Sequence, residues 1–193
     1  MALAAAGPLV FSDAVFAALF SLAFFAWIAG ELRWLWLRRA HGDRRAHGQA
    51  LSVIVFCWLG LWLAALCAER FAALSLAPSR VFALVGLVAV CAGLVGRRSA
   101  ERAFAALSYS ARAGRAPGPY RYIRHPGFAA SLVTMLGFGL LLSNWASLCL
   151  CVLVPLVGYL HRISVEESAL AALFGRDYGR YARETARLLP GVW

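Results

Sequence analysis

The sequence predicts an all-α polytopic membrane protein with about five transmembrane helices. Of its 193 residues, 62% are hydrophobic, and the mean hydropathy is +0.72, whereas about half of a soluble domain is apolar. The apolar residues also gather in runs close to the 20 or so residues that a helix needs to cross a bilayer. We expect one domain over residues 1–193, in which residues 1–117 carry three crossings and a basic loop and residues 118–193 a hairpin and a C-terminal helical segment.

The apolar runs place the five expected crossings at residues 8–37, 50–68, 76–96, 126–143 and 145–160. The first is overlong, and Ser12 and Asp13 are candidate caps for its start. The last two crossings meet at a very short turn of Ser143, Asn144 and Trp145. A connection this short predicts a tight antiparallel helical hairpin.

The positive charge is explained by membrane topology. The formal net charge is +10, and every Lys/Arg position is an arginine. All arginines except Arg70 and Arg80 fall in the first loop, the third loop or the C-terminal tail, which lie on one side of a five-helix arrangement. The positive-inside rule then predicts an outside N-terminus and a cytoplasmic C-terminus in a bacterial-type inner membrane. Nucleic acid is therefore not an expected partner.

The cysteines do not predict a metal site. All five lie in apolar segments, none belongs to a Cys-x-x-Cys pair, and buried free thiols are the expectation.

A first polar cluster lies at the mouth of the fourth crossing, in the stretch GPYRYIRHPGFAAS at residues 118–131. Pro126 suits the first position of a helix and pushes His125 out of helical geometry. Arg124 and His125 should then lie where the first N–H groups and the positive end of the helix dipole create a site for an anion. The alternative is a loop anchor of interfacial tyrosines and arginines.

A second polar cluster follows the fifth crossing and contains His161, Arg162, Glu166 and Glu167. Arg162 and Glu166 are four residues apart and can share a helix face. A pair of glutamates is unusual on a side that is otherwise basic. The alternative is a solvated helix start with one surface ion pair, which would contribute little stability.

The C-terminal region predicts a helix that lies on the membrane surface. Arg176, Arg180, Arg183 and Arg187 step by four, three and four residues, which gives one basic stripe suited to anionic lipid headgroups.

These elements together resemble the isoprenylcysteine carboxyl methyltransferase and phospholipid methyltransferase group of small polytopic enzymes. The resemblance covers about residues 118–193 and rests on ordered elements: Arg-His-Pro, the Asn after the fourth crossing, the Arg four residues before a Glu pair, Phe-Gly-x-x-Tyr-x-x-Tyr, and the terminal Arg-Leu-Leu-Pro. Residues 1–117 match only as hydrophobic helices.

The resemblance implies S-adenosylmethionine as cofactor and a lipophilic or small-molecule methyl acceptor that comes from the bilayer. It implies a cytoplasmic cofactor pocket covered by the C-terminal segment. Arg162 would position the acceptor, and His125 is the candidate base for an amine or phenol acceptor. The expected catalytic residues are Arg162, His125 and Glu167. The implied cofactor-binding residues are Tyr120, Arg124, His125, Pro126, Glu166 and Glu167.

The acceptor group stays open among a carboxylate, an amine, a phenol and a thiol, and the sequence does not give the oligomeric state. One alternative function is an NADPH-dependent membrane reductase on a related scaffold, because sterol-reductase-like proteins share similar Arg-His-Pro and C-terminal Tyr motifs. The other is a membrane module without enzymatic activity.

Overall fold

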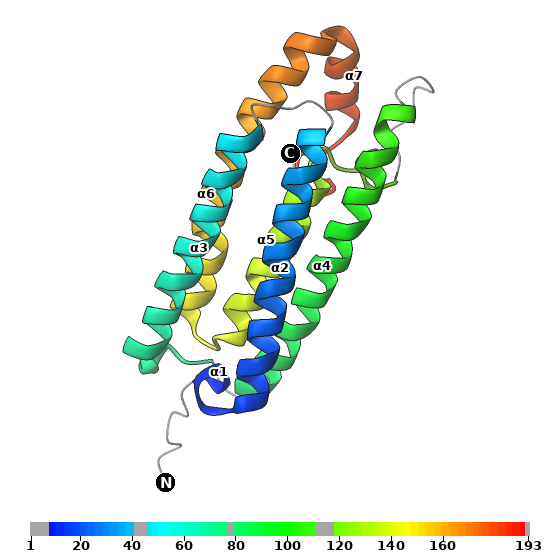
Figure 1. The fold of residues 1–193 in the computed structure, drawn as a ribbon. Helices are drawn as coiled ribbons and strands as arrows, with labels where there is room; N and C mark the ends of the chain where they lie inside the picture. The colour runs from blue at the N-terminus through cyan, green and yellow to red at the C-terminus, as the bar shows by residue number, and fades with distance from the viewer. Residues whose placement is uncertain (1–7, 41–45, 77–78, 111–117, 192–193) are drawn as a thin grey trace.

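The structure is a computed structural model that describes residues 8–40, 46–76, 79–110 and 118–191. These residues form helices and two short 3₁₀ turns, and no extended strand occurs among them. Figure 1 shows α2 to α6 side by side along one long axis, with α1 at one end of this bundle and α7 at the other. The α-helices are α1 Leu9–Ser12, α2 Ala14–Ala40, α3 Ala46–Arg70, α4 Ser79–Ser110, α5 Pro126–Leu141, α6 Trp145–Phe174 and α7 Arg176–Glu184.

The expected all-α polytopic fold is confirmed. Four described helices, α2, α3, α4 and α6, are long and apolar enough to cross a membrane, and α5 is a shorter apolar helix. At 1.5 Å per residue, the 16 residues of α5 extend about 24 Å, somewhat less than the roughly 30 Å of a bilayer core. α5 occupies the position of the fourth expected crossing and ends at Leu141 rather than Ser143.

The first expected crossing, residues 8–37, is interrupted near its start. α1 ends at Ser12, and the extended backbone of Asp13 separates it from α2. The Oδ1 atom of Asp13 accepts a hydrogen bond of 2.9 Å from the backbone N of Val15. Asp13 thus caps a helix as expected, but the helix is α2 and not one that begins at Pro8.

Two other crossings continue well beyond their apolar runs. α4 reaches Ser110 rather than stopping at Gly96, and α6 reaches Phe174 rather than Leu160. Arg97, Arg98 and Arg102 consequently lie on a helix and not in the expected third loop. Arginine and glutamate are good helix formers, so the end of an apolar run does not mark the end of the helix.

Small residues let α4 and α5 approach closely. A Cβ atom on Gly86 would lie 2.7 Å from the carbonyl oxygen of Gly137, and one on Gly93 would lie 2.7 Å from that of Ala130. Association of this kind is typical of membrane helices, where packing replaces the hydrophobic effect. It fixes the position of α5, whose first turn carries the Arg-His-Pro sequence.

The α5–α6 hairpin is confirmed. Ser143 adopts a left-handed backbone with φ of 48°. The side chain of Asn144 caps α6 by accepting from the backbone N of Ser147 at 3.2 Å, and its amide donates to the carbonyl oxygen of Phe71 at 2.9 Å. Asn144 therefore connects the hairpin turn to the first turn of α6 and to Phe71, which follows α3. The turn brings α6 back along α5.

Candidate functional site

The entrance to α5 has the geometry that its sequence predicts. Pro126 occupies the first helical position, and His125, with φ of −123° and ψ of 59°, is the non-helical residue before it. The backbone N of Arg124 donates to the carbonyl oxygen of Ala186 at 2.7 Å, and that of His125 donates to the carbonyl oxygen of Arg187 at 3.1 Å. The segment after α7 therefore runs directly against the residues that precede α5.

The two polar clusters of the sequence converge. The Nε atom of Arg124 donates to Oε1 of Glu167 at 2.8 Å, and Nε2 of His125 lies 3.4 Å from the same oxygen. These groups are more than 40 residues apart along the chain. They meet because the hairpin lays α6 along α5 and because α6 continues as one helix through Arg162, Glu166 and Glu167.

Arg187 belongs to this site and not to a basic stripe. α7 ends at Glu184, so Arg187 lies beyond the helix, and its Nε atom is 2.9 Å from Oε2 of Glu167. The expectation of one helical stripe through Arg187 is wrong, because a run of basic residues at helical spacing cannot show where the helix ends. Glu167 thus contacts two guanidinium groups and one imidazole ring.

Arg124 also fixes the C-terminal segment through its other nitrogens. Its Nη1 atom donates to the carbonyl oxygen of Ala182 at 2.6 Å and to that of Thr185. These carbonyls lie at the end of α7, where helix carbonyls have no partner within the helix and where a cation is favoured by the dipole. The side chain of Arg124 thus connects α5, α6 and α7.

Two tyrosines of α7 face the entrance to α5. Tyr181 donates its hydroxyl to the carbonyl oxygen of Tyr120 at 2.8 Å. The hydroxyl oxygen of Tyr178 is buried and finds no hydrogen-bond partner within the described part of the chain. Burial, followed by the nearby carboxylate of Glu167, raises the pKa of Tyr178 to about 12, so the hydroxyl keeps its proton at neutral pH.

His125 lies in an apolar surrounding on its other side. Its ring stacks on that of Phe128 with centroids 5.7 Å apart and an interplanar angle of 13°, and Phe128 contacts Tyr159 at 5.1 Å. Burial lowers the pKa of His125, although the carboxylates of Glu166 and Glu167 act in the opposite direction. The ring is therefore neutral at pH 7.

Arg162 and Glu166 lie one and two turns further along the face of α6 that carries Tyr159. The Nε atom of Arg162 is 3.9 Å from Oε2 of Glu166, and the Arg162 side chain is buried whereas Glu166 is half-buried. At 3.9 Å this contact is an ion pair and lies beyond hydrogen-bond range. The alternative of a solvated surface pair does not fit a buried arginine.

A second ion-pair network, which the sequence patterns did not predict, connects α2, α4 and α5. Arg97 donates through Nη2 to Glu31 and through Nη1 to the carbonyl oxygen of Gly127 at 2.9 Å, and Ser131 donates to Oε1 of Glu31 at 2.8 Å. Arg97, Glu31 and Ser131 are all buried. In the sequence, Glu31 near the end of an apolar run could have indicated this network, because an ionisable residue within a membrane helix usually has a partner inside the bundle.

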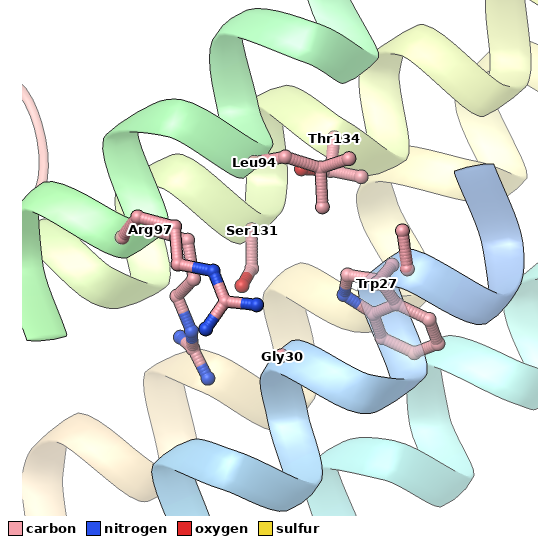
Figure 2. A pocket seen from close by; sticks show the side chains of 8 residues that line it. Trp27, Gly30, Leu94, Arg97, Ser131 and Thr134 are labelled. Atoms are coloured by element: carbon pink, nitrogen blue, oxygen red, sulfur yellow. The ribbon is translucent and has the colours of Figure 1, made fainter.

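Beside this network lies a cavity of about 120 Å³, shown in Figure 2. This volume is well below the roughly 300–1,000 Å³ of pockets that hold drug-sized ligands. We therefore do not assign the cavity to S-adenosylmethionine. Its lining residues are Ala26, Trp27, Gly30, Leu94, Arg97, Arg98, Ser131 and Thr134.

Comparison with known proteins confirms the resemblance inferred from the sequence. The family model described as phospholipid methyltransferase matches residues 110–177. Protein-S-isoprenylcysteine O-methyltransferase of Schizosaccharomyces pombe is 34% identical over 73 residues, which are 38% of this chain and 31% of that protein. A probable protein-S-isoprenylcysteine O-methyltransferase of Oryza sativa subsp. indica is 36% identical over 75 residues, 39% of each chain.

The chain thus matches between three and four tenths of the length of these curated relatives. The family model begins at Ser110, the last residue of α4, and ends at Asp177 in the first turn of α7. It therefore includes the Arg-His-Pro entrance of α5 and the glutamate pair of α6.

Proposed function

We propose that this protein is an integral membrane methyltransferase that uses S-adenosylmethionine and methylates a lipophilic acceptor. The observation that supports this most directly is the convergence of Arg124 and His125 with Glu167 under the C-terminal segment. Such a constellation is expected of a cofactor site and has no role in a simple membrane anchor. The match of residues 110–177 to the phospholipid methyltransferase family supports the same reaction class.

The residues of the site fit the groups of this cofactor. Glu166 and Glu167 offer carboxylate acceptors for the ammonium group or the ribose hydroxyls. The unpartnered hydroxyl of Tyr178 is a buried donor that a bound ligand would satisfy. Tyr120 and Phe128 are the proposed aromatic contacts for adenine, and Pro126 shapes the first turn of α5.

Arg124 has a different role in this proposal from direct binding of the cofactor carboxylate. Its Nε and Nη1 atoms are both engaged by protein acceptors. We therefore assign to Arg124 the task of holding α7 and the following segment over the site. If this segment lost its ordered structure, the affinity for the cofactor would fall, although no direct contact with the cofactor would have been removed.

S-adenosylmethionine supplies a methyl group that its sulfonium has already activated. Alignment of the acceptor and exclusion of water are then the main contributions of the protein, and good alignment can supply up to roughly 7–11 kcal/mol. The hydrogen bond of His125 to the acceptor-only carboxylate of Glu167 requires the proton on Nε2, which leaves Nδ1 as the basic nitrogen. The ring can take a proton from an amine or phenol, whereas a carboxylate acceptor needs no base.

We propose a lipophilic carboxylate as the acceptor group. The curated relatives carry the name isoprenylcysteine O-methyltransferase, and the buried guanidinium of Arg162 could pair with an anionic group. We further propose that the N-terminus is outside and that the site faces the cytoplasm, in a bacterial-type inner membrane. This orientation follows from the arginines around the entrance of α5 and in α7.

The direct test is transfer of labelled methyl from S-adenosylmethionine into a lipid extract of the host, followed by identification of the product. A thermal shift in detergent with S-adenosylhomocysteine, compared with NADPH, separates this function from a reductase. Stabilisation by NADPH alone would support the reductase, and absence of both shifts and of labelled product would contradict methyl transfer.

Arg162→Ala tests the role of Arg162. We expect turnover to fall by about 100-fold because the acceptor loses its orientation, while the affinity for S-adenosylhomocysteine changes little. Arg180→Ala, at an exposed position of α7, is the control. Equal losses of turnover and cofactor affinity in Arg162→Ala would contradict a role in positioning the acceptor.

A further inference from the structure

The cavity among α2, α4 and α5 adjoins Gly30. Gly30 of α2 is buried, yet a Cβ atom added to it would meet no atom within 4 Å. At about 120 Å³ the cavity approaches the volume of engineered apolar cavities that bind benzene. The space is therefore sufficient for one end of a small or chain-like ligand.

Two buried hydrogen-bond donors at this cavity have no acceptor within the described residues. They are Nε1 of Trp27 and Nε of Arg97. Trp27 is 2% exposed and Arg97 is 3% exposed, and both residues line the cavity. Figure 2 shows the indole nitrogen of Trp27 on the side of its ring that faces Arg97 and Ser131.

The other polar groups of the cavity are already satisfied. Both terminal nitrogens of Arg97 are used, by Gly127 and Glu31, and the hydroxyl of Ser131 is used by Glu31. Two buried donors without a partner, next to polar groups that do have partners, indicate that an acceptor is missing. A buried donor without a partner carries the full free-energy cost of its desolvation.

The remaining surroundings favour an amphiphile. Ala26, Leu94 and the Trp27 ring provide apolar lining, and the cavity lies within the candidate membrane spans Ala14–Trp36 and Arg80–Phe104. Arg98 adds a cation at the rim, with a side chain that is 44% exposed and paired to Glu101. An acidic or carbonyl oxygen at the end of a hydrocarbon chain would match both the donors and the lining.

We propose that this cavity binds the polar end of a single-chain amphiphile whose carboxylate or carbonyl oxygen accepts hydrogen bonds from Trp27 Nε1 and Arg97 Nε. The hydrocarbon chain of the ligand would extend into the bilayer. This site is separate from Glu167 and does not depend on methyl transfer.

The test is quenching of tryptophan fluorescence by 2-bromododecanoate, whose bromine lies next to the carboxylate and therefore beside Trp27, with the purified protein in detergent. We expect a saturable component in the wild type that is absent with 1-bromoundecane, which lacks the oxygen. Gly30→Leu should fill the cavity and weaken the saturable binding by about tenfold or more, the effect of losing one good contact. Ala29→Leu, at an exposed position of the same helix, is the matched control and should behave like the wild type.

Trp27→Phe keeps an aromatic ring but removes the donor, and it also removes the fluorophore at the cavity. Binding of the bromo acid to this variant is therefore measured by equilibrium dialysis, and it should be about tenfold or more weaker than binding to the wild type. Circular dichroism and gel filtration establish that each variant is folded. Equal titrations of the wild type, Gly30→Leu and Ala29→Leu would overturn the proposal, because quenching would then come from lipid around the protein and the cavity would hold only water. Equal effects of the bromo acid and the bromoalkane would overturn the role of the oxygen acceptor.

Discussion

Two ion-pair networks at the same end of the bundle are built differently. In the first, Glu31 and Arg97 are both buried and bind one another, a serine and a backbone carbonyl. In the second, Glu167 receives contacts from Arg124, His125 and Arg187, and it keeps partial exposure. The first joins three membrane helices, whereas the second holds the C-terminal segment against the entrance of α5.

We therefore expect the first network to contribute mainly to stability and the second to be available for function. A fully buried pair has little freedom to exchange partners, so its loss should appear in the folding equilibrium. A carboxylate shared by three cationic or titratable groups can exchange one of them for a ligand.

Arg97→Met should have the largest effect. It leaves Glu31 as a buried charge without its partner, which typically costs about 3–5 kcal/mol in the free energy of unfolding. Unfolding in mixed detergent micelles measures this. Arg80→Met, at an exposed position of α4, is the control and should cost no more than about 1 kcal/mol.

The double variant Arg97→Met with Glu31→Met should recover part of this loss, because two apolar side chains replace two charges. An Arg97→Met protein as stable as Arg80→Met would contradict the assignment of the first network to stability.

Glu167→Gln should have a smaller effect on overall stability and a local effect on the C-terminal segment. It removes the charge from the hydrogen bond with Arg124 and the contact with Arg187, and a hydrogen bond to a charged group contributes about 1.5–3 kcal/mol. Hydrogen exchange at the amides of Arg124, His125 and Ala186 should accelerate, because these amides pair the two segments.

Glu184→Gln, at the exposed end of α7, is the control for this experiment. Unchanged exchange at those three amides in Glu167→Gln would show that the segment is held without the carboxylate.

The pH dependence of stability should report His125. Burial lowers its pKa in the folded protein from the ordinary value of 6.5. Below about pH 6.5 the unfolded chain binds a proton that the folded chain does not, so stability should fall as the pH decreases through this range. Each pH unit can cost at most about 1.4 kcal/mol for one such group.

His125→Gln should flatten this part of the Tm profile between pH 7.5 and 5.5. His161→Gln, at an exposed position of α6, should leave the slope unchanged. Parallel profiles for the wild type and His125→Gln would contradict the burial of a neutral ring.

Gly127→Ala should have the smallest effect and tests whether the two networks are independent. A Cβ atom there would lie 3.2 Å from Nη1 of Arg97, the far end of a flexible side chain, so a small adjustment relieves the contact. We expect a change in unfolding free energy below about 1 kcal/mol, close to the helix preference of Ala over Gly. A large loss of methyl transfer with unchanged stability would show that the networks are coupled through the first turn of α5.

The sequence by itself determined the helical membrane fold, the start of α5 at Pro126 and the α5–α6 hairpin. Each of these follows from local signals: apolar runs of membrane length, a proline that fixes backbone geometry, and an asparagine that caps a helix. The sequence also marked Arg124, His125, Glu166 and Glu167 through residue types that are unusual at a membrane boundary.

Only the tertiary structure decided which charges meet. The partners of Arg97 lie on α2 and α5, and no spacing along the chain relates residues 31, 97 and 127. The contact of Arg187 with Glu167 likewise depends on the end of α7 and the return of the chain toward α5. Local propensity fixes helices, whereas ion pairs between helices depend on how those helices pack.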